Sequence, residues 1–295
     1  MSLPRLPPSQ PDLPGLPGLD HAAALALLRR GELDIQGRLE VSSNSALYCL
    51  IRSGSVTAAA IYKPVRFERP LWDFPDETLA RREVAAAIVS DASGWGIVPP
   101  TVLRDGPFGP GMVQLWIDTD PAVHSWDLVR TSDVRLRPMA IFDAVVNNTD
   151  RKGGHILPVC LDGPALAPSA AETPGREPGG ERGEELVRAE IGDEPVDHSA
   201  RPLHLYGVDH GVCFSDEPKL RTVLWAWRGK KLHADELAVL VALRAGLDGR
   251  LGRRLGALLE PVEVQATRER LDALIATGRF PRPDPERPAI PWPPY

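Results

Sequence analysis

The sequence predicts an α+β fold in two parts, an antiparallel sheet with one helix followed by a mostly helical region. Three short runs rich in apolar and β-branched residues follow one another within 32–64, and small polar connections separate them. A helical pattern at 76–94 precedes two more strand-like runs, and the periodicity after Trp225 is almost entirely helical. We therefore expect a five-stranded N-terminal sheet with one inserted helix, then a helical C-terminal part.

The N-terminal elements have clear boundaries in the sequence. DHAAALALLRRG predicts a helix with Asp20 as its N-cap and Gly31 beyond its end. ELDIQGRLE, SALYCLIR and VTAAAIYKP predict three strands of an antiparallel meander, joined by VSSNS and SGS. In the helix expected at 76–94, apolar residues fall on one side and the charged Arg82 and Glu83 are interleaved, which indicates a solvated face.

The remaining elements follow in order along the chain. The expected strands are IVPPTVLRD, GMVQLWID, HILPVC and HLYGVDHGVCF, and the expected helices are SWDLVR, LRPMAIFDAVV, ADELAVLVALRAGL, GRRLGALL and VEVQATRERLDALIATG. They divide the chain into a disordered Pro-rich leader (1–19), an N-terminal lobe (20–118), a C-terminal lobe (119–280) and a Pro-rich tail (281–295). A Pro-, Gly- and Glu-rich stretch at about 162–202 predicts a disordered insertion.

Composition excludes several classes of protein. The 295 residues carry a net charge of −6, which gives no broad reason to bind nucleic acid or an anionic membrane. No run approaches the roughly 18 apolar residues of a transmembrane helix, and the Pro-rich start has no signal-peptide core. Cys49, Cys160 and Cys213 are widely spaced without a CxxC pair, so we expect buried free thiols and a cytoplasmic protein.

A polar bend between two apolar runs, VVNNTDRKGGHIL at 145–157, is the most unusual stretch of the sequence. It contains Asp150, Lys152 two residues later and His155 five residues later. Asp150 alone is compatible with an Asx turn, in which Asn and Asp side chains bond the backbone. The density of ionisable groups in one loop also suits a reactive site, and the residues alone leave both interpretations open.

Three further ionisable residues stand where they could join this loop. Asp209 lies in GVDHGVCF, which the removal of the insertion brings next to the strand after Asp150; by itself the Asp-His-Gly stretch also suits a plain β-turn. Lys63 ends a predicted strand and Glu83 lies on the following helix, positions that are commonly edge and solvent-facing residues. One acid to accept a proton, one to hold a metal and a lysine to hold phosphate form the set that phosphoryl transfer needs.

NNTDRKGGHIL together with GVDHGVCF resembles the catalytic and metal-binding loops of the phosphatidylinositol 3-/4-kinase-like superfamily. The similarity is greatest to type II phosphatidylinositol 4-kinases and HipA-type kinases, within a bacterial branch, and spans about residues 35–245. The resemblance implies a bilobal protein-kinase-like fold. It also implies that Asp150 is the catalytic acid/base, that Asp209 chelates a metal bridging the ATP phosphates, that Lys63, held by Glu83, contacts the α/β phosphates, and that Lys152 contacts the γ-phosphate.

The resemblance also assigns the nucleotide-covering segments. It places VSSNSA where the phosphate-covering loop lies, and VQLWI at the hinge that pairs with adenine. The residues implied in cofactor binding are Ser42, Ser43, Asn44, Ser45, Gln114, Leu115 and Trp116. The first segment lacks the usual glycines, so hydroxyl and backbone N–H groups would cradle the phosphates.

Two departures from the family pattern bear on the metal. The family has Asn five residues after the catalytic acid, as a second metal ligand, whereas this chain has His155. Mg²⁺ prefers hard oxygen ligands, so a histidine here favours Mn²⁺, a single ion or an altered reaction. His210 replaces the usual Phe or Asn of the metal-binding turn.

The resemblance therefore implies an ATP- and Mg²⁺-dependent kinase with an alcohol group as acceptor. The absence of a basic amphipathic helix argues against a membrane phosphoinositide, which leaves a protein Ser/Thr or a soluble small molecule. Two alternatives stay open. The same fold could transfer AMP, or it could bind nucleotide or a partner without turnover, which His155 and the missing glycine-rich loop favour.

Overall fold

A five-stranded antiparallel sheet forms the N-terminal part of the chain, as predicted. The computed structural model describes residues 12–13, 16–39, 46–161 and 201–295. The strands of this sheet lie in the order β3-β4-β5-β7-β6. Their bounds are β3 (Glu32–Arg38), β4 (Leu47–Ser53), β5 (Val56–Pro64), β6 (Thr101–Gly106) and β7 (Gly109–Leu115).

Alternating side chains fix the face of the sheet that is buried. Cys49 and Ile51 of β4 and Ala60 and Tyr62 of β5 point into one apolar cluster, and the residues between them are more exposed. Helix α1 (His21–Arg30) covers this face, and the Asp20 side chain accepts a 2.7 Å hydrogen bond from the Ala23 N–H at its start. Both the helix and its cap agree with the sequence prediction.

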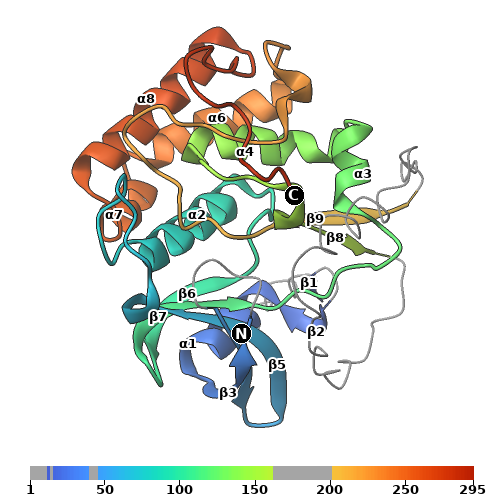
Figure 1. Cartoon of the computed structure of the whole chain (residues 1–295), viewed down its shortest axis with the longest axis vertical. Helices are drawn as coiled ribbons and strands as arrows, with labels where there is room; N and C mark the ends of the chain where they lie inside the picture. The colour runs from blue at the N-terminus through green and yellow to red at the C-terminus, as the bar shows by residue number, and fades with distance from the viewer. Residues whose placement is uncertain (1–11, 14–15, 40–45, 162–200) are drawn as a thin grey trace, which may run out of the picture.

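Helix α2 (Leu79–Ser93) lies between the sheet and the helical part of the molecule (Figure 1). The apolar residues of α2 belong to the same cluster as the C-terminal helices. Its N-cap residue Thr78 provides no side-chain cap; instead the Glu68 carboxylate accepts from the N–H groups of Leu79 and Ala80 at 3.0 and 2.7 Å. A residue of the preceding loop thus fixes the start of α2.

The prediction that Arg82 and Glu83 lie on a solvent-exposed face of α2 was wrong. Arg82 and Glu83 are 1% and 2% exposed. Arg82 forms an ion pair with Glu263 and donates to the Cys213 carbonyl at 2.8 Å, so its charge is compensated by residues far along the chain. The helical pattern could not reveal this, because the partners belong to the other lobe.

In its described residues, the C-terminal part is mainly helical and contains a two-stranded sheet. Its elements are α3 (Ser125–Arg130), η2 (Val134–Leu136), α4 (Arg137–Val146), η3 (Gly153–His155), β8 (Ile156–Cys160), β9 (Leu203–Gly207), η4 (Trp225–Trp227), α6 (Ala234–Gly246), α7 (Arg250–Gly256) and α8 (Pro261–Thr277). The strands β8 and β9 pair antiparallel, with Ile156 opposite Gly207. This is the hairpin that the sequence predicts across the insertion, but the second strand ends at Gly207 and does not continue to Phe214.

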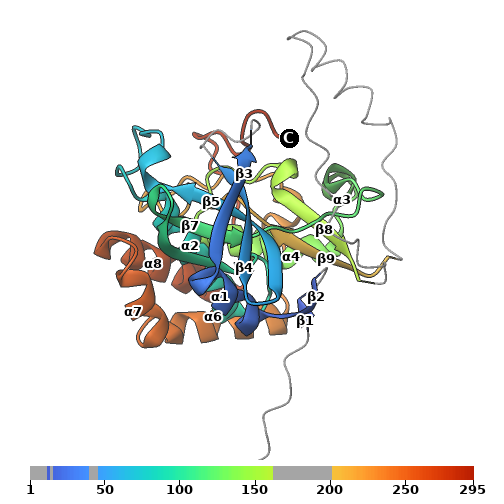
Figure 2. The same ribbon diagram turned by 90° about the horizontal axis from the view of Figure 1, so that it is seen from below.

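The two parts lie one above the other in Figure 1, with the sheet lobe below the helical lobe; Figure 2 looks at the sheet lobe from below, with the helices behind it. The predicted lobe boundary at residue 118 stays a prediction.

Residues 12–13 and 16–20 form a short hairpin, β1 (Asp12–Leu13) with β2 (Leu16–Asp20), where the sequence suggested disorder up to residue 19. The expected disordered insertion lies almost wholly outside the described residues.

The cysteines are free thiols, with Cys49 and Cys213 buried and Cys160 half-buried. No helix in the described part of the chain has both the length and the apolar character needed to cross a membrane.

The buried Arg82 gives a test of this packing. Replacing Arg82 by Met should lower the free energy of unfolding by about 3–5 kcal/mol, because the Glu263 carboxylate would stay buried without its partner. Urea unfolding followed by circular dichroism measures the change. Arg81→Met is the matched control, since Arg81 is the exposed neighbour on the same helix, and equal losses for the two variants would contradict the packing described.

Candidate active site

The Lys63 ammonium group lies between two carboxylates that come from different parts of the chain. Its Nζ is 2.5 Å from Glu83 Oε1 on α2 and 2.9 Å from Asp209 Oδ1, which follows β9. Lys63 points away from the apolar face of β5 because its neighbour Tyr62 points into it. The structure therefore brings together the three residues that the sequence analysis assigned to phosphate and metal binding.

The charges of Lys63 and Asp209 stabilise each other. Burial alone would lower the pKa of Lys63, but the charges of Asp209 and Glu83 outweigh it and raise that pKa above its ordinary value. The Lys63 charge in turn holds the pKa of Asp209 well below its usual range. Near neutral pH, Lys63 is thus an ammonium and Asp209 a carboxylate, and the carboxylate oxygens of Asp209 can bind a cation.

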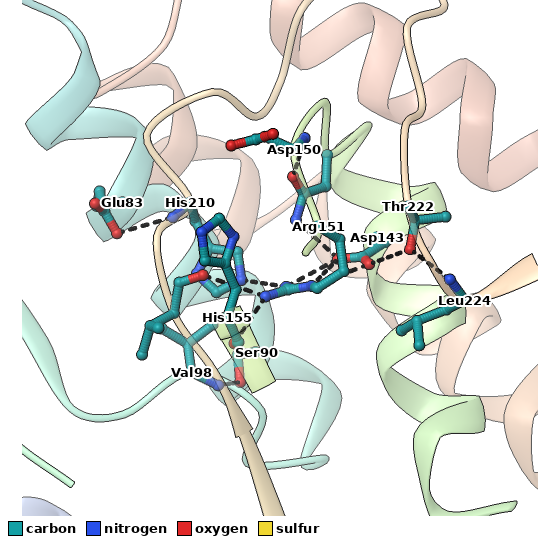
Figure 3. Close-up of polar contacts among 12 residues, drawn as sticks. Glu83, Ser90, Val98, Asp143, Asp150, Arg151, His155, His210, Thr222 and Leu224 are labelled. Atoms are coloured by element: carbon teal, nitrogen blue, oxygen red, sulfur yellow. Dashed lines mark hydrogen bonds and ion pairs between the residues drawn. The ribbon is translucent and has the colours of Figure 1, made fainter. Parts of the chain in front are cut away.

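Glu83 also fixes the turn that carries Asp209. Its second oxygen, Oε2, accepts a 3.0 Å hydrogen bond from the backbone N–H of His210 (Figure 3). Asp209 itself has a φ of 60°, in the left-handed region that is uncommon outside glycine. The backbone conformation ends strand pairing after β9 and directs the carboxylate towards Lys63.

Asn147 is the C-cap of helix α4, and the loop that carries Asp150 starts there. Asn147 takes the left-handed conformation, with φ 51° and ψ 56°, as helix-terminating Asn residues often do. Its side-chain amide donates to the carbonyls of Ser215 and Glu217, and its Oδ1 accepts from the Lys219 N–H. The end of α4 is thereby joined to the segment after Asp209.

Arg151 is the buried centre of this loop. Its guanidinium is fully buried and contacts both oxygens of Asp143 on α4, with the closest N–O distance 2.9 Å. It also donates to the Val208 carbonyl at 3.2 Å, and its Nη2 lies 2.6 Å from Nε2 of His210 (Figure 3). One side chain therefore joins helix α4, the loop of Asp150 and the turn of Asp209.

His210 is neutral in this arrangement. Burial lowers the pKa of its imidazole far below the ordinary value, and the Arg151 charge lowers it further. Because a guanidinium only donates, we assign Nε2 as the acceptor and place the proton on Nδ1. His210, one of the two residues that depart from the family pattern, is thus part of the buried network.

Sequence reasoning missed Arg151 and Asp143. The available signal was the acid inside the apolar helix segment AIFDAVV, which must be compensated when buried. Thr222 completes the network by donating from its hydroxyl to Asp143 Oδ2 at 3.1 Å.

The Asx turn that the sequence analysis left open at Asp150 is also present, since Asn148 Oδ1 accepts from the Asp150 N–H at 3.0 Å. The turn and a reactive site are compatible here.

Asp150, Lys152 and His155 lie on the side of the loop near Asp209. Lys152 Nζ is 3.3 Å from Asp150 Oδ2, and His155 Nε2 is 3.6 Å from Asp209 Oδ2. Burial raises the pKa of Asp150, although the charges of Lys152 and His155 oppose it, and burial lowers the pKa of His155. A carboxylate with a raised pKa next to a lysine is a suitable proton acceptor for a hydroxyl group.

The metal-binding expectation rests on Asp209 and His155. No group of three or more His, Cys, Asp or Glu side chains arranged for a metal occurs within the described residues. The pair nevertheless fits one divalent ion whose other ligands are phosphate oxygens and water, since an ionised carboxylate faces a neutral imidazole. His155 Nδ1 is buried and has no hydrogen-bond partner among the described residues, while its Nε2 faces Asp209 Oδ2.

The proposed adenine-binding segment lies at the end of β7. The Gln114 side chain is buried and donates to Thr101 Oγ1 at 2.8 Å, so it does not face a nucleotide. The N–H groups of Leu115 and Trp116 already donate to the carbonyls of Pro100 and Ala59. Adenine contacts would therefore fall on carbonyl groups or on residues after Trp116. Ser42, Ser43, Asn44 and Ser45 of the phosphate-covering loop lie outside the described residues.

The chain is similar in sequence to a protein of Mycobacterium tuberculosis along most of its length. No protein-family model matches the chain. The sequence is 36% identical over 306 residues to Protein Rv2133c of Mycobacterium tuberculosis (strain ATCC 25618 / H37Rv), across 92% of this chain and 95% of that protein.

Two solved structures superimpose on the chain. The Golgi casein kinase with Mn/ADP bound gives a TM-score of 0.52 at 12% identity, over 87% of this chain and 75% of that chain. A second crystal structure of the Golgi casein kinase gives 0.52 at 13% identity, over 87% and 74%. The predicted bilobal, kinase-like α+β fold is thus confirmed. The comparisons do not distinguish the phosphatidylinositol 4-kinase or HipA branches, so that finer resemblance stays a prediction.

The Arg151 network can be tested by a charge-preserving change. Arg151→Lys should lower the free energy of unfolding by about 2 kcal/mol or more, because an ammonium cannot reach Asp143, the Val208 carbonyl and His210 together. Arg221→Lys, at a half-buried position nearby, serves as the control in the same urea titration. An Arg151→Lys variant as stable as the wild type would exclude the central role of this guanidinium.

Proposed function

The chain belongs to the same family as Protein Rv2133c of Mycobacterium tuberculosis, and from its kinase-like fold and charged site we propose that it is an ATP-dependent phosphotransferase. The observation that carries the proposal is the position of Lys63 between Glu83 and Asp209, beside the loop of Asp150. Phosphoryl transfer is chiefly a matter of positioning and charge neutralisation, and this site supplies fixed charges of both signs.

Each residue has a role that its surroundings support. Lys63 would bind the α/β phosphates, because its charge is permanent and Glu83 restricts its position. Asp209 and His155 would hold a divalent cation, which neutralises phosphate charge when bound. The Mn/ADP bound to the Golgi casein kinase is compatible with this assignment. An imidazole ligand favours Mn²⁺ over Mg²⁺.

Asp150 would accept the proton of the attacking hydroxyl. Burial raises the pKa of the Asp150 carboxyl, and a higher pKa makes the carboxylate a stronger base. Lys152, now paired with Asp150 at 3.3 Å, would turn to the γ-phosphate when nucleotide is bound. We propose a protein Ser/Thr or a soluble small molecule as the acceptor.

A second candidate function is nucleotide binding without transfer. His155 favours it, because the imidazole replaces the amide that normally supplies a second oxygen ligand. AMP transfer is distinguished from both by mass, since an adenylyl group adds far more mass to an acceptor than a phosphoryl group.

Two carboxylate variants should separate binding from chemistry. Asp209→Asn should abolish the thermal shift that ATP with Mn²⁺ or Mg²⁺ produces, because the cation loses its charged ligand. Asp150→Asn should keep that shift but lower the transfer of labelled γ-phosphate by about 10²- to 10⁴-fold. Transfer to the chain itself, to casein as a general acceptor and to water is measured in parallel.

Asp216→Asn is the matched control, since Asp216 is exposed on the segment that follows Asp209. A wild-type protein that shows no thermal shift with either ion would exclude the proposed function. Tight binding without transfer or hydrolysis would select the second candidate.

A further inference from the structure

Residues 289–295, here called the C-terminal segment, lie along the loop that carries Asp150. The Ala289 carbonyl accepts a 3.0 Å hydrogen bond from the N–H of Thr222, and the Pro294 carbonyl accepts one of 2.9 Å from the N–H of Gly153. In both views the C-terminus lies beside the yellow-green segment that precedes β8 (Figures 1 and 2). A tail expected only to be Pro-rich therefore contacts the loop of the proposed active site.

Gly153 lies in a slot between two aromatic rings. A Cβ atom at this position would lie 2.7 Å from Cδ2 of Tyr295 and 2.9 Å from Cε3 of Trp126, closer than side chains approach each other. The two rings pack edge to face, with centroids 6.2 Å apart. The Gly153 carbonyl accepts from the Ser125 hydroxyl at 2.8 Å. Gly153 is buried and both its backbone groups are bonded, so this part of the loop has little freedom.

The loop is fixed on both sides of Lys152. On one side, the backbone of Arg151 pairs with the segment of Arg221 and Val223, through bonds of 3.1 Å each. On the other side, Gly153 is held by Pro294. Asp150 and Lys152 therefore belong to a short stretch whose two ends are restrained, and only the second restraint comes from the C-terminal segment.

We propose that the C-terminal segment positions Asp150 and Lys152 for phosphoryl transfer, with Tyr295 and Trp126 as positioning residues that hold Gly153 between them. The proposal rests on the function proposed above. Lys63, Glu83 and Asp209 come from other elements, whereas Lys152 and His155 flank Gly153, so loss of the segment should lower transfer more strongly than it weakens nucleotide binding.

The kinetic test uses Tyr295→Ala and Gly153→Ala in the full chain. Each should lower kcat by about tenfold to a hundredfold, with a smaller change in KM for ATP, because a shift of about 1 Å in a catalytic group has that effect. Trp292→Ala is the matched control: Trp292 belongs to the same segment but is 89% exposed, and kcat should stay at the wild-type value. Tyr295→Phe retains the ring and should also retain activity.

The second test does not depend on turnover. Amide hydrogen exchange of residues 151–154 should become faster in Tyr295→Ala than in the wild type and in Trp292→Ala. Gly154→Ala controls for the added methyl group, because nothing lies within 4 Å of a Cβ there. If the wild type transfers no phosphate, the proposed function fails and the role in transfer fails with it, and exchange then decides whether the C-terminal segment restrains the loop. Unchanged exchange, or a fall in kcat equal for Tyr295→Ala and Trp292→Ala, would overturn it.

Discussion

The ammonium group of Lys63, held between the carboxylates of Glu83 and Asp209, is the interaction on which the candidate site depends. It joins strand β5, helix α2 and the turn after β9, which are far apart in the sequence. Without that cation, the carboxylates of Glu83, which is buried, and of Asp209, which is half-buried, would repel each other. The backbone N–H of His210, bound to Glu83, adds a second link between α2 and the metal-binding turn.

Buried charge with a distant partner recurs around this trio. Arg82 connects α2 to Glu263 on α8, and Arg151 connects α4 to both functional loops. Such groups are costly to bury, so their value is in fixing one arrangement of loops whose side chains must act together. Helix α2 is restrained at its start by Glu68 and within its first turns by Arg82, and Glu83 follows directly. These restraints fix the position of Glu83 beside Lys63.

Local patterns in the sequence predict much of the fold and less of the site. Alternation in β4 and β5 and the Asp20 cap of α1 depend on residues close together, and the structure agrees with them. Lys63, Glu83 and Asp209 were linked through a family resemblance, because nothing local indicates that positions 63 and 209 meet. Arg82 was expected in solvent, and the Gly153–Pro294 contact was not foreseen. Both depend on tertiary neighbours more than 130 residues away, which periodicity cannot encode.

The most direct measurement is a crystal structure with a non-hydrolysable ATP analogue and Mn²⁺, in which anomalous scattering locates the metal independently of any expectation about the site. The account predicts one Mn²⁺ peak within coordination distance of an Asp209 oxygen and of the phosphates, with Lys63 on those phosphates and the γ-phosphate facing Asp150. A peak remote from Asp209, or a nucleotide bound away from Lys63, would contradict it.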